Sequence, residues 1–159
     1  VNTDLFQKVN FIGHSGDQLH WKIECDAIGS PEWECLATMI MEYETRPFQA
    51  AIGIPRGGLI PAVMMSHSFD IKYISYSSAK LLPSELRAKT LVVDDIADTG
   101  HTLKEAIELK FITSTLAMRV GSIATPRLYG ELVTDQRWLV FPWETLDSIP
   151  MQDYLVEQK

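Results

Sequence analysis

Hydrophobic and polar residues along the chain predict a repeating order of strand, polar turn and helix. Residues 48–54 form a short apolar run that ends at the proline- and glycine-rich turn 55–58, and residues 59–69 follow with helical character. Residues 89–93 are a second β-rich run, which ends in two aspartates ahead of a helix expected at residues 102–110. Because strands and helices alternate, the pattern indicates an α/β fold with a mostly parallel sheet and helices on both faces.

The segments around these two units carry weaker patterns. Residues 30–43 show helical spacing after a serine and a proline, which are typical of a helix start. Residues 71–76 and 116–125 are expected to be strands, and residues 77–87 a mobile loop. Residues 1–29 contain a turn-like segment followed by alternating apolar and polar residues, so we interpret them as a hairpin or an N-terminal extension.

Size, composition and charge narrow the class of protein. The 159 residues are 46% hydrophobic and 22% charged, so we expect one globular domain over residues 1–159. The net charge of -7 argues against nucleic acid or an anionic membrane as a partner. The sequence shows no long apolar run and no signal-peptide pattern at its start, and its two cysteines lack redox or metal spacing. We therefore expect a cytoplasmic protein.

The two polar turns carry the candidate chemistry. In open α/β sheets ligands bind outside the carboxyl ends of the strands, so both turns are expected to face one cleft. The second turn brings Thr99, Gly100 and Thr102 to the start of a helix, where hydroxyls and backbone N–H groups can cradle a phosphate. Asp94 and Asp95 end the preceding strand, where paired carboxylates can accept hydrogen bonds from sugar hydroxyls or hold water around magnesium.

Two other interpretations of the acidic pair remain open from these residues alone. One is a capped strand end with solvated acids. The other is the start of a receiver domain, in which a hydrophobic strand also ends in two aspartates. In a receiver domain the pair lies near the N-terminus, whereas Asp94 here follows 93 residues.

Three segments resemble a known family. Residues 91–102, LVVDDIADTGHT, resemble the phosphoribosyl pyrophosphate motif of type I phosphoribosyltransferases. Residues 53–61, GIPRGGLIP, are similar to the family's pyrophosphate loop, and residues 138–144, WLVFPWE, to the closing segment of small microbial guanine, xanthine and hypoxanthine members. The resemblance implies the type I phosphoribosyltransferase fold, a central mostly parallel sheet flanked by helices. It also implies a small hood formed by the C-terminal residues 125–146. Residues 1–29 are a candidate second part of this hood.

The same resemblance implies a site for phosphoribosyl pyrophosphate. Asp94 and Asp95 would meet the ribose hydroxyls and, through water or the substrate, Mg²⁺. Asp98 would act as the general acid/base at N7 of a purine, because the ring must lose a proton as it bonds to the sugar. The other contacts to phosphoribosyl pyrophosphate or nucleotide would come from Arg56, Gly57, Gly58, Ala97, Thr99, Gly100, His101 and Thr102.

The implied base site rests on fewer residues. Trp138 would stack on the purine, and the backbone at Leu139 would meet the edge of the base, with core packing as the alternative for the tryptophan. Purine members usually carry Lys-Pro after the strand expected here at residues 116–125, and the lysine reaches the 6-oxo group of the base. This chain instead has a proline between Thr125 and Arg127. Either residue would then contact the base, or the base preference has changed.

The loop beginning Ser75-Tyr76 is similar to the family's lid over the active site, with a plain surface loop as the alternative. The implied reaction joins phosphoribosyl pyrophosphate to a 6-oxopurine (guanine, hypoxanthine or xanthine), giving a nucleoside 5'-monophosphate and pyrophosphate in purine salvage. Mg²⁺ would be the cofactor, and a homodimer or homotetramer the assembly. Two alternatives stay open: a same-fold enzyme acting on another or modified base, and a non-catalytic regulator that binds phosphoribosyl pyrophosphate or a nucleotide.

Overall fold

The structure, a computed structural model, describes the central part of the chain and portions of its two ends. The described residues are 6–12, 18–23, 48–135, 138–141 and 143–144. The chain divides into two units, one spanning Leu36–Thr134 and the other joining Val1–Cys35 to Asp135–Lys159. The helix predicted at residues 30–43 lies outside the described residues. Within the described part of the chain, no helix is long and apolar enough to cross a membrane.

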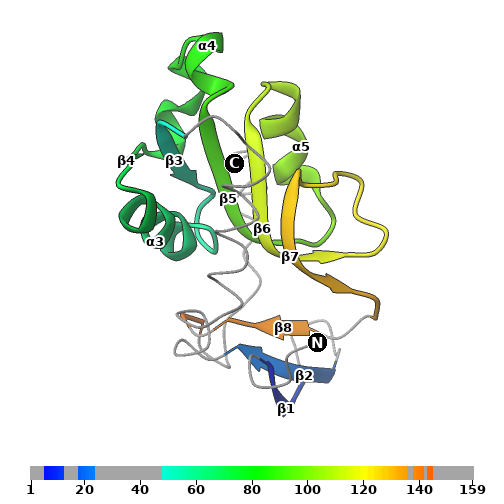
Figure 1. The fold of residues 1–159 in the computed structure, drawn as a ribbon. Helices are drawn as coiled ribbons and strands as arrows, with labels where there is room; N and C mark the ends of the chain where they lie inside the picture. The colour runs from blue at the N-terminus through cyan, green and yellow to red at the C-terminus, as the bar shows by residue number, and fades with distance from the viewer. Residues whose placement is uncertain (1–5, 13–17, 24–47, 136–137, 142, 145–159) are drawn as a thin grey trace, which may run out of the picture. The chain divides into compact units, whose positions relative to one another are not determined.

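The larger unit contains a five-stranded sheet in which every neighbouring pair of strands is parallel. In spatial order its strands are β4 (Lys72–Tyr73), β3 (Ala50–Gly53), β5 (Thr90–Ala97), β6 (Ile112–Arg119) and β7 (Leu128–Val133). The carboxyl ends of these strands therefore point the same way (Figure 1). The predicted parallel α/β sheet is confirmed.

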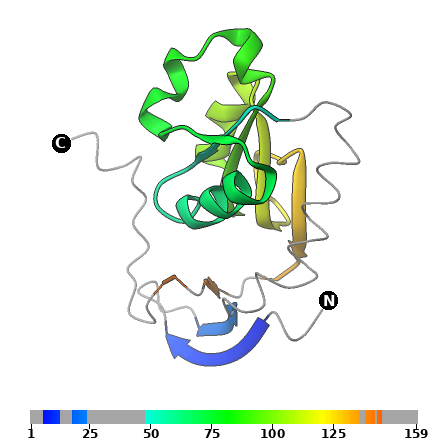
Figure 2. The ribbon, with the colours of Figure 1, turned by 60° about the vertical axis from the view of Figure 1, so that its left-hand side comes forward.

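Helices cover both faces of this sheet. The chain moves from β3 outward to β4 through α3 (Leu59–Phe69), and from β5 the other way to β6 through α5 (His101–Glu108). Right-handed crossovers in opposite directions place the two helices on opposite faces (Figures 1 and 2). The buried side of α3 is lined by Pro61, Ala62 and Met65, which pack against β3 and β5.

The segment predicted as the loop 77–87 contains two short helices instead. These are η1, a 3-10 helix at Tyr76–Leu81, and α4 at Ser84–Arg87. Ala79 of η1 is buried in the hydrophobic core that lies under α5. The Arg87 side chain donates hydrogen bonds to two backbone carbonyls, from Nε to Leu82 O at 2.8 Å and from Nη2 to Lys80 O at 2.9 Å. These bonds tie the end of the segment to its middle, so the segment is a compact helical turn and not an extended loop.

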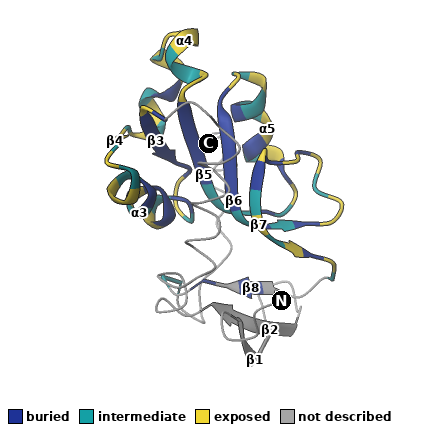
Figure 3. Ribbon diagram, viewed as in Figure 1, coloured by how far each residue is buried: buried dark blue, intermediate teal, exposed yellow. Residues whose placement is uncertain are grey.

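The central strands are buried on both faces, as expected for a parallel sheet between helix layers (Figure 3). Three strands have other bounds than expected. The strand predicted at residues 71–76 is only Lys72–Tyr73, and the strand predicted at residues 89–93 runs on to Ala97. The strand predicted at residues 116–125 occupies Ile112–Arg119. Its first half is polar in composition, yet Thr113, Ser114 and Thr115 are all buried. The strand starts earlier than the apolar residues alone suggest because β-branched threonines are favoured in strands. It also ends earlier, because Gly121, with a φ of 95°, lies in the turn that follows it.

The smaller unit contains a three-stranded sheet that joins the two ends of the chain. β1 (Phe6–Ile12) and β2 (Gln18–Ile23) form an antiparallel hairpin, and β8 (Trp138–Val140) pairs parallel with β2. Residues near the N-terminus thus share one sheet with part of the predicted hood segment, residues 138–140, whereas residues 128–133 of that segment form β7 of the larger sheet. Beyond β8, the rings of Phe141 and Trp143 stack with their centroids 5.3 Å apart.

Candidate active site

Two polar turns meet at the carboxyl ends of adjacent strands, as the sequence predicts. β3 pairs with β5 in a register that sets Gly53 beside Val93. Just beyond, the backbone N–H of Ile54 donates to the Val93 carbonyl at 2.9 Å. The glycine turn that follows β3 and the acidic pair in β5 are therefore neighbours in space.

The glycine turn packs against the acidic strand so closely that Gly57 and Gly58 have no room for a side chain. A Cβ atom on Gly58 would lie 2.2 Å from the Val93 carbonyl oxygen, and one on Gly57 would lie 1.9 Å from Asp95 Oδ2. The peptide bond between Pro55 and Arg56 is cis, and the Arg56 side chain is exposed. The turn therefore presents backbone groups and one arginine beside the carboxylates, a combination suited to phosphate oxygens.

Asp94 and Asp95 sit near the end of β5 in a partly buried position. Asp94 Oδ1 accepts a hydrogen bond from the Asp95 backbone N–H at 3.0 Å, and Asp95 Oδ1 accepts one from the Ile96 N–H at 2.7 Å. Burial, followed by the neighbouring Asp95 charge, raises the pKa of the Asp94 carboxyl well above its usual range. Burial also raises the pKa of Asp95. The ionised form of such a pair is stabilised by hydrogen bonds from hydroxyl groups or by a nearby cation.

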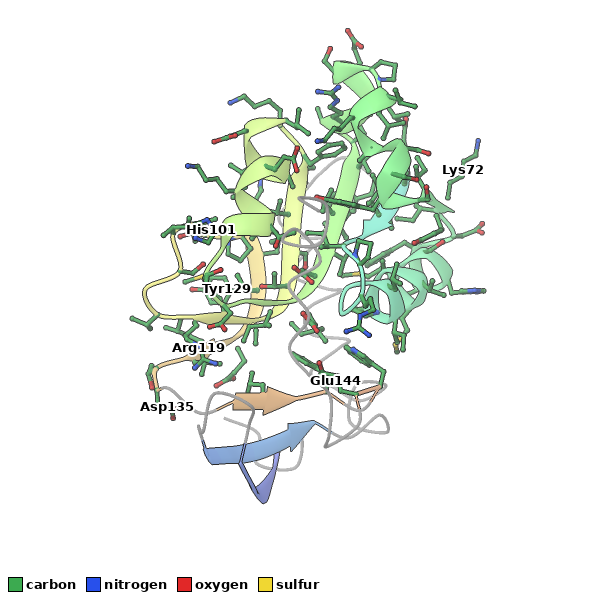
Figure 4. All side chains as sticks on the ribbon, turned by 180° about the vertical axis from the view of Figure 1, so that it is seen from behind. Lys72, His101, Arg119, Tyr129, Asp135 and Glu144 are labelled. Atoms are coloured by element: carbon green, nitrogen blue, oxygen red, sulfur yellow. The ribbon has the colours of Figure 1, made fainter. Side chains whose placement is uncertain are left out.

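The loop from Asp98 to Thr102 leads into the N-terminus of α5. Gly100 precedes the helix with φ 85°, a left-handed conformation that favours glycine. A Cβ atom there would lie 2.4 Å from Ser122 Oγ and 2.6 Å from the Ala124 backbone nitrogen. Thr99 and His101 are exposed, and Thr102 is half-buried (Figure 4 labels His101). The loop thus offers hydroxyls and the positive end of a helix to an anion, while Ala97 is buried behind it.

Asp98 pairs with Arg119, a residue that no sequence motif singles out. Arg119, the last residue of β6, directs its Nε to Asp98 Oδ1 at 2.5 Å. The arginine side chain is only 11% exposed, whereas that of Asp98 is 41% exposed. The sequence does offer one sign of this residue: Arg119 is a single basic residue at the end of a strand-forming segment, just before Val120 and Gly121.

The residues expected to take the place of Lys-Pro lie in the segment that leads to β7. Thr125 and Arg127 are exposed, and the Arg127 backbone N–H donates to Thr113 Oγ1 at 3.2 Å. Thr113 is the second residue of β6, so Arg127 is near the amino end of that strand. The arginine at the carboxyl end, beside the acidic loop, is Arg119. A contact of Thr125 or Arg127 with a base stays a prediction.

The remaining predicted residues fall in two places. Trp138 and Leu139 form part of β8 in the smaller unit, where Leu139 is buried. Ser75 is exposed just before η1, with its Oγ 2.8 Å from Ser77 Oγ, and Tyr76 packs partly buried against the core. Base stacking by Trp138 and a lid at Ser75 and Tyr76 stay predictions.

A metal ion at this site would need ligands besides those that the described residues supply. Among the described residues, no three His, Cys, Asp or Glu side chains gather in a group that could hold a metal ion. The carboxylates of Asp94 and Asp95 are the hard oxygen donors that Mg²⁺ prefers, and Mg²⁺ commonly keeps waters or substrate phosphates as its other ligands. The pair therefore fits a Mg²⁺ ion that arrives with its substrate.

Comparisons with known proteins agree with this geometry. No protein-family model matches the chain. A xanthine-guanine phosphoribosyltransferase of Nitratidesulfovibrio vulgaris is 29% identical over 119 residues, which cover 64% of this chain and 72% of that protein. The crystal structure of a purine phosphoribosyltransferase from Pyrococcus horikoshii is 29% identical with a TM-score of 0.64, covering 82% of this chain and 97% of that one.

A third likeness is to a hypothetical protein from Neisseria gonorrhoeae, whose crystal structure contains bound ppGpp. It is 26% identical, with a TM-score of 0.62, over 79% of this chain and 90% of that chain. Both solved structures therefore share the fold described above over most of its length.

Proposed function

We propose that this chain, a type I phosphoribosyltransferase, transfers the 5-phosphoribosyl group from phosphoribosyl pyrophosphate to a purine base. The products would be a nucleoside 5'-monophosphate and pyrophosphate. The observation that carries the proposal is the packing of the Gly57–Gly58 turn directly against Asp95, on the strand β5 that leads into the phosphate loop at Gly100. This arrangement offers separate places for a pyrophosphate, a diol and a single phosphate, the three polar parts of that substrate.

The polar parts of phosphoribosyl pyrophosphate are distributed over the two turns. The backbone of the glycine turn and the guanidinium of Arg56 hold the pyrophosphate, because an arginine fork matches phosphate oxygens. Asp94 and Asp95 accept hydrogen bonds from the two ribose hydroxyls. The 5'-phosphate binds at the N-terminus of α5, where Thr99 and Thr102 add hydroxyl donors and the helix dipole favours negative charge.

Mg²⁺ would be held near Asp94 and Asp95, through water or through the substrate. When bound, it offsets the negative charge that builds on the departing pyrophosphate. Burial raises the pKa of both carboxylates and so favours their protonated form. A nearby Mg²⁺ would oppose this effect, because a cation favours the ionised form of a carboxylate.

The bond changes need one proton acceptor on the protein. A ring nitrogen of the base bonds to C1' of the ribose as the bond from C1' to the pyrophosphate oxygen breaks. The purine then loses the proton at N7, and the half-exposed Asp98 carboxylate can receive it. The positive charge that develops on the ribose ring is stabilised by fixed dipoles and charges in the site, without a covalent intermediate.

A 6-oxopurine is the proposed base. The relative from Nitratidesulfovibrio vulgaris is named for xanthine and guanine, and the structural neighbour from Pyrococcus horikoshii for purines. Trp138 and the Leu139 backbone remain the proposed contacts to the base. Another or modified base is the alternative, since the Lys-Pro pair usual in purine members is absent from residues 125–127.

The proposed chemistry is tested by Asp98→Asn, with Asp70→Asn as the matched control. Asp70 is an exposed aspartate at the end of α3, away from both turns. General-base catalysis contributes about 10²–10⁴-fold, so Asp98→Asn should lower kcat at least 100-fold while phosphoribosyl pyrophosphate still binds. Asp70→Asn should retain the wild-type rate. Unchanged turnover in Asp98→Asn would contradict the assigned role.

A second candidate function is a regulator that binds a nucleotide without turning it over. The likeness to a protein solved with bound ppGpp favours it, because ppGpp carries a diphosphate and a purine. Calorimetric titration with ppGpp, run beside the turnover assay, separates the two. Binding of ppGpp with no turnover of any base would favour the regulator, and turnover would favour the enzyme.

A further inference from the structure

Asp98 and Arg119 are neighbours because of the register between two central strands. β5 and β6 run parallel, with Ala97 paired to Met118 at the end of the ladder. The residue after Ala97 is Asp98, just beyond β5, and the residue after Met118 is Arg119, the last of β6. Their contact, Nε to Oδ1 at 2.5 Å, therefore lies at the carboxyl edge of the sheet, where the phosphate loop begins.

The exposures of the two side chains show which member of the pair is fixed and which faces outward. The Arg119 side chain is 11% exposed, while that of Asp98 keeps 41% of its surface exposed. Burying a guanidinium has a high desolvation cost, and an apolar side chain commonly serves stability as well as a buried ion pair does. A buried arginine at this position therefore calls for a role beyond packing. Its planar fork can fix the plane of a carboxylate, which a lysine point charge does less well.

The turn that follows Arg119 also holds the next residue of the phosphate loop. The Ile123 backbone N–H donates to the Thr99 carbonyl at 2.9 Å, and Ser122 and Ala124 pack against Gly100. Ser122 Oγ donates to the Ala124 carbonyl at 2.9 Å and so braces the turn itself. The end of β6 and its turn thus support Asp98 through a side chain and Thr99 through the backbone.

We propose that Arg119 is a positioning residue that holds one carboxylate oxygen of Asp98 while the exposed part of that carboxylate faces the base. This inference rests on the proposed function, because it assigns Arg119 a role through the general base. Arg119 contributes to the chemical step by keeping Asp98 oriented before the base arrives. A misplacement of about 1 Å of a catalytic group can lower the rate on the order of 100-fold.

The test compares kcat and KM for Arg119→Met and Arg119→Lys with the wild-type enzyme. Arg119→Met should lower kcat about 10- to 100-fold, with KM for phosphoribosyl pyrophosphate within about twofold of wild type. Arg119→Lys keeps the charge and should recover part of kcat. Lys72→Met, which removes an exposed cation on the edge strand β4, should leave both constants unchanged and controls for net charge.

A double-mutant cycle separates positioning from a general structural effect. Once Asp98→Asn has removed the base, adding Arg119→Met or Arg119→Lys should lower kcat by less than about twofold, because the two residues act as a unit. Full additivity would overturn the proposal. A kcat for Arg119→Met within twofold of wild type would also overturn it. A rise in KM for the base alone would overturn it as well, because Arg119 would then contact the base directly. If Arg119→Met does not fold, Arg119→Lys carries the same comparison. A wild-type enzyme without turnover on any base would instead remove the proposed function, and this role with it.

Discussion

Gly57 and Asp95 pack so closely that the glycine turn has no space for a Cβ atom, which would lie 1.9 Å from the Asp95 carboxylate. The turn comes from the loop after β3, and the carboxylate from the neighbouring strand β5. Their contact joins the proposed pyrophosphate and ribose sites into one surface. The proposed active site therefore depends on the absence of a side chain as much as on the charged groups that flank it.

Gly57→Ala should weaken the binding of phosphoribosyl pyrophosphate. The added methyl group must displace either the turn or the Asp95 carboxylate, and overpacking of this kind costs about 1–3 kcal/mol. We expect KM for phosphoribosyl pyrophosphate to rise at least about tenfold in steady-state assays, with a smaller change in KM for the base. An unchanged KM for phosphoribosyl pyrophosphate would show that the turn does not form this part of the site.

Asp94→Asn should change how stability depends on pH. Burial and the Asp95 charge raise the pKa of Asp94 in the folded state, so the folded protein binds this proton more tightly than the unfolded chain does. The free energy of unfolding must then fall as pH rises from the ordinary aspartate pKa of about 3.9 through the raised pKa. Asn cannot ionise and keeps an acceptor for the Asp95 N–H, so the variant should exceed wild type in Tm at pH 8.

The measurement is thermal unfolding of both proteins between pH 5 and pH 8 without Mg²⁺ or substrate. The difference in Tm in favour of Asp94→Asn should grow as pH rises, and activity should be lost. Asp70→Asn is the control for removal of an exposed acid and should track wild type across the range. A difference that shrinks toward pH 8 would contradict the pKa direction given for Asp94.

Gly100→Ala should destabilise the protein more than Gly121→Ala. Both glycines have positive φ, 85° and 95°, so alanine meets similar backbone strain at each, about 1 kcal/mol. A Cβ atom on Gly100 would also collide with Ser122 and Ala124, whereas one on Gly121 would meet nothing within 4 Å. Denaturant unfolding should therefore show an extra loss of about 1–3 kcal/mol for Gly100→Ala. Equal losses would mean that the turn after β6 does not pack tightly on the phosphate loop.

Arg87→Met should cost more stability than Lys80→Met, although both remove a cation from the same segment. Arg87 donates to two carbonyls and lies 5.9 Å from the centroid of the Phe111 ring, so we expect a loss of about 1–3 kcal/mol. The Lys80–Glu105 ion pair is 2.6 Å long but exposed, and such pairs contribute about 0–1 kcal/mol. Urea unfolding of the two variants gives the comparison, and the reverse order would contradict it.

The two polar turns could be predicted because local sequence largely determines their conformation. Gly100 adopts a positive φ that glycine favours, and the apolar runs before each turn become buried strands. The first unit, from residue 48 to residue 69, therefore follows the predicted order of strand, turn and helix. In these segments local preference and tertiary packing favour the same structure.

Arg119 could not be predicted in the same way because its role depends on strand register. Hydrophobicity alone extends the strand to residue 125, whereas buried Thr113, Ser114 and Thr115 shift it toward the N-terminus. That shift brings Arg119, rather than Arg127, to the carboxyl edge. The pairing of Ala97 with Met118 then sets Arg119 beside Asp98, a relation between residues 21 apart in sequence.

Phosphoribosyl transfer to a purine is measured as the initial rate of pyrophosphate release with Mg²⁺, phosphoribosyl pyrophosphate and one base at a time. The bases are guanine, hypoxanthine, xanthine, adenine and orotate. We predict turnover with at least one of the three 6-oxopurines, and slower or no release with adenine and orotate. No release with any base, while phosphoribosyl pyrophosphate or ppGpp still binds, would contradict the enzyme and leave the nucleotide-binding regulator.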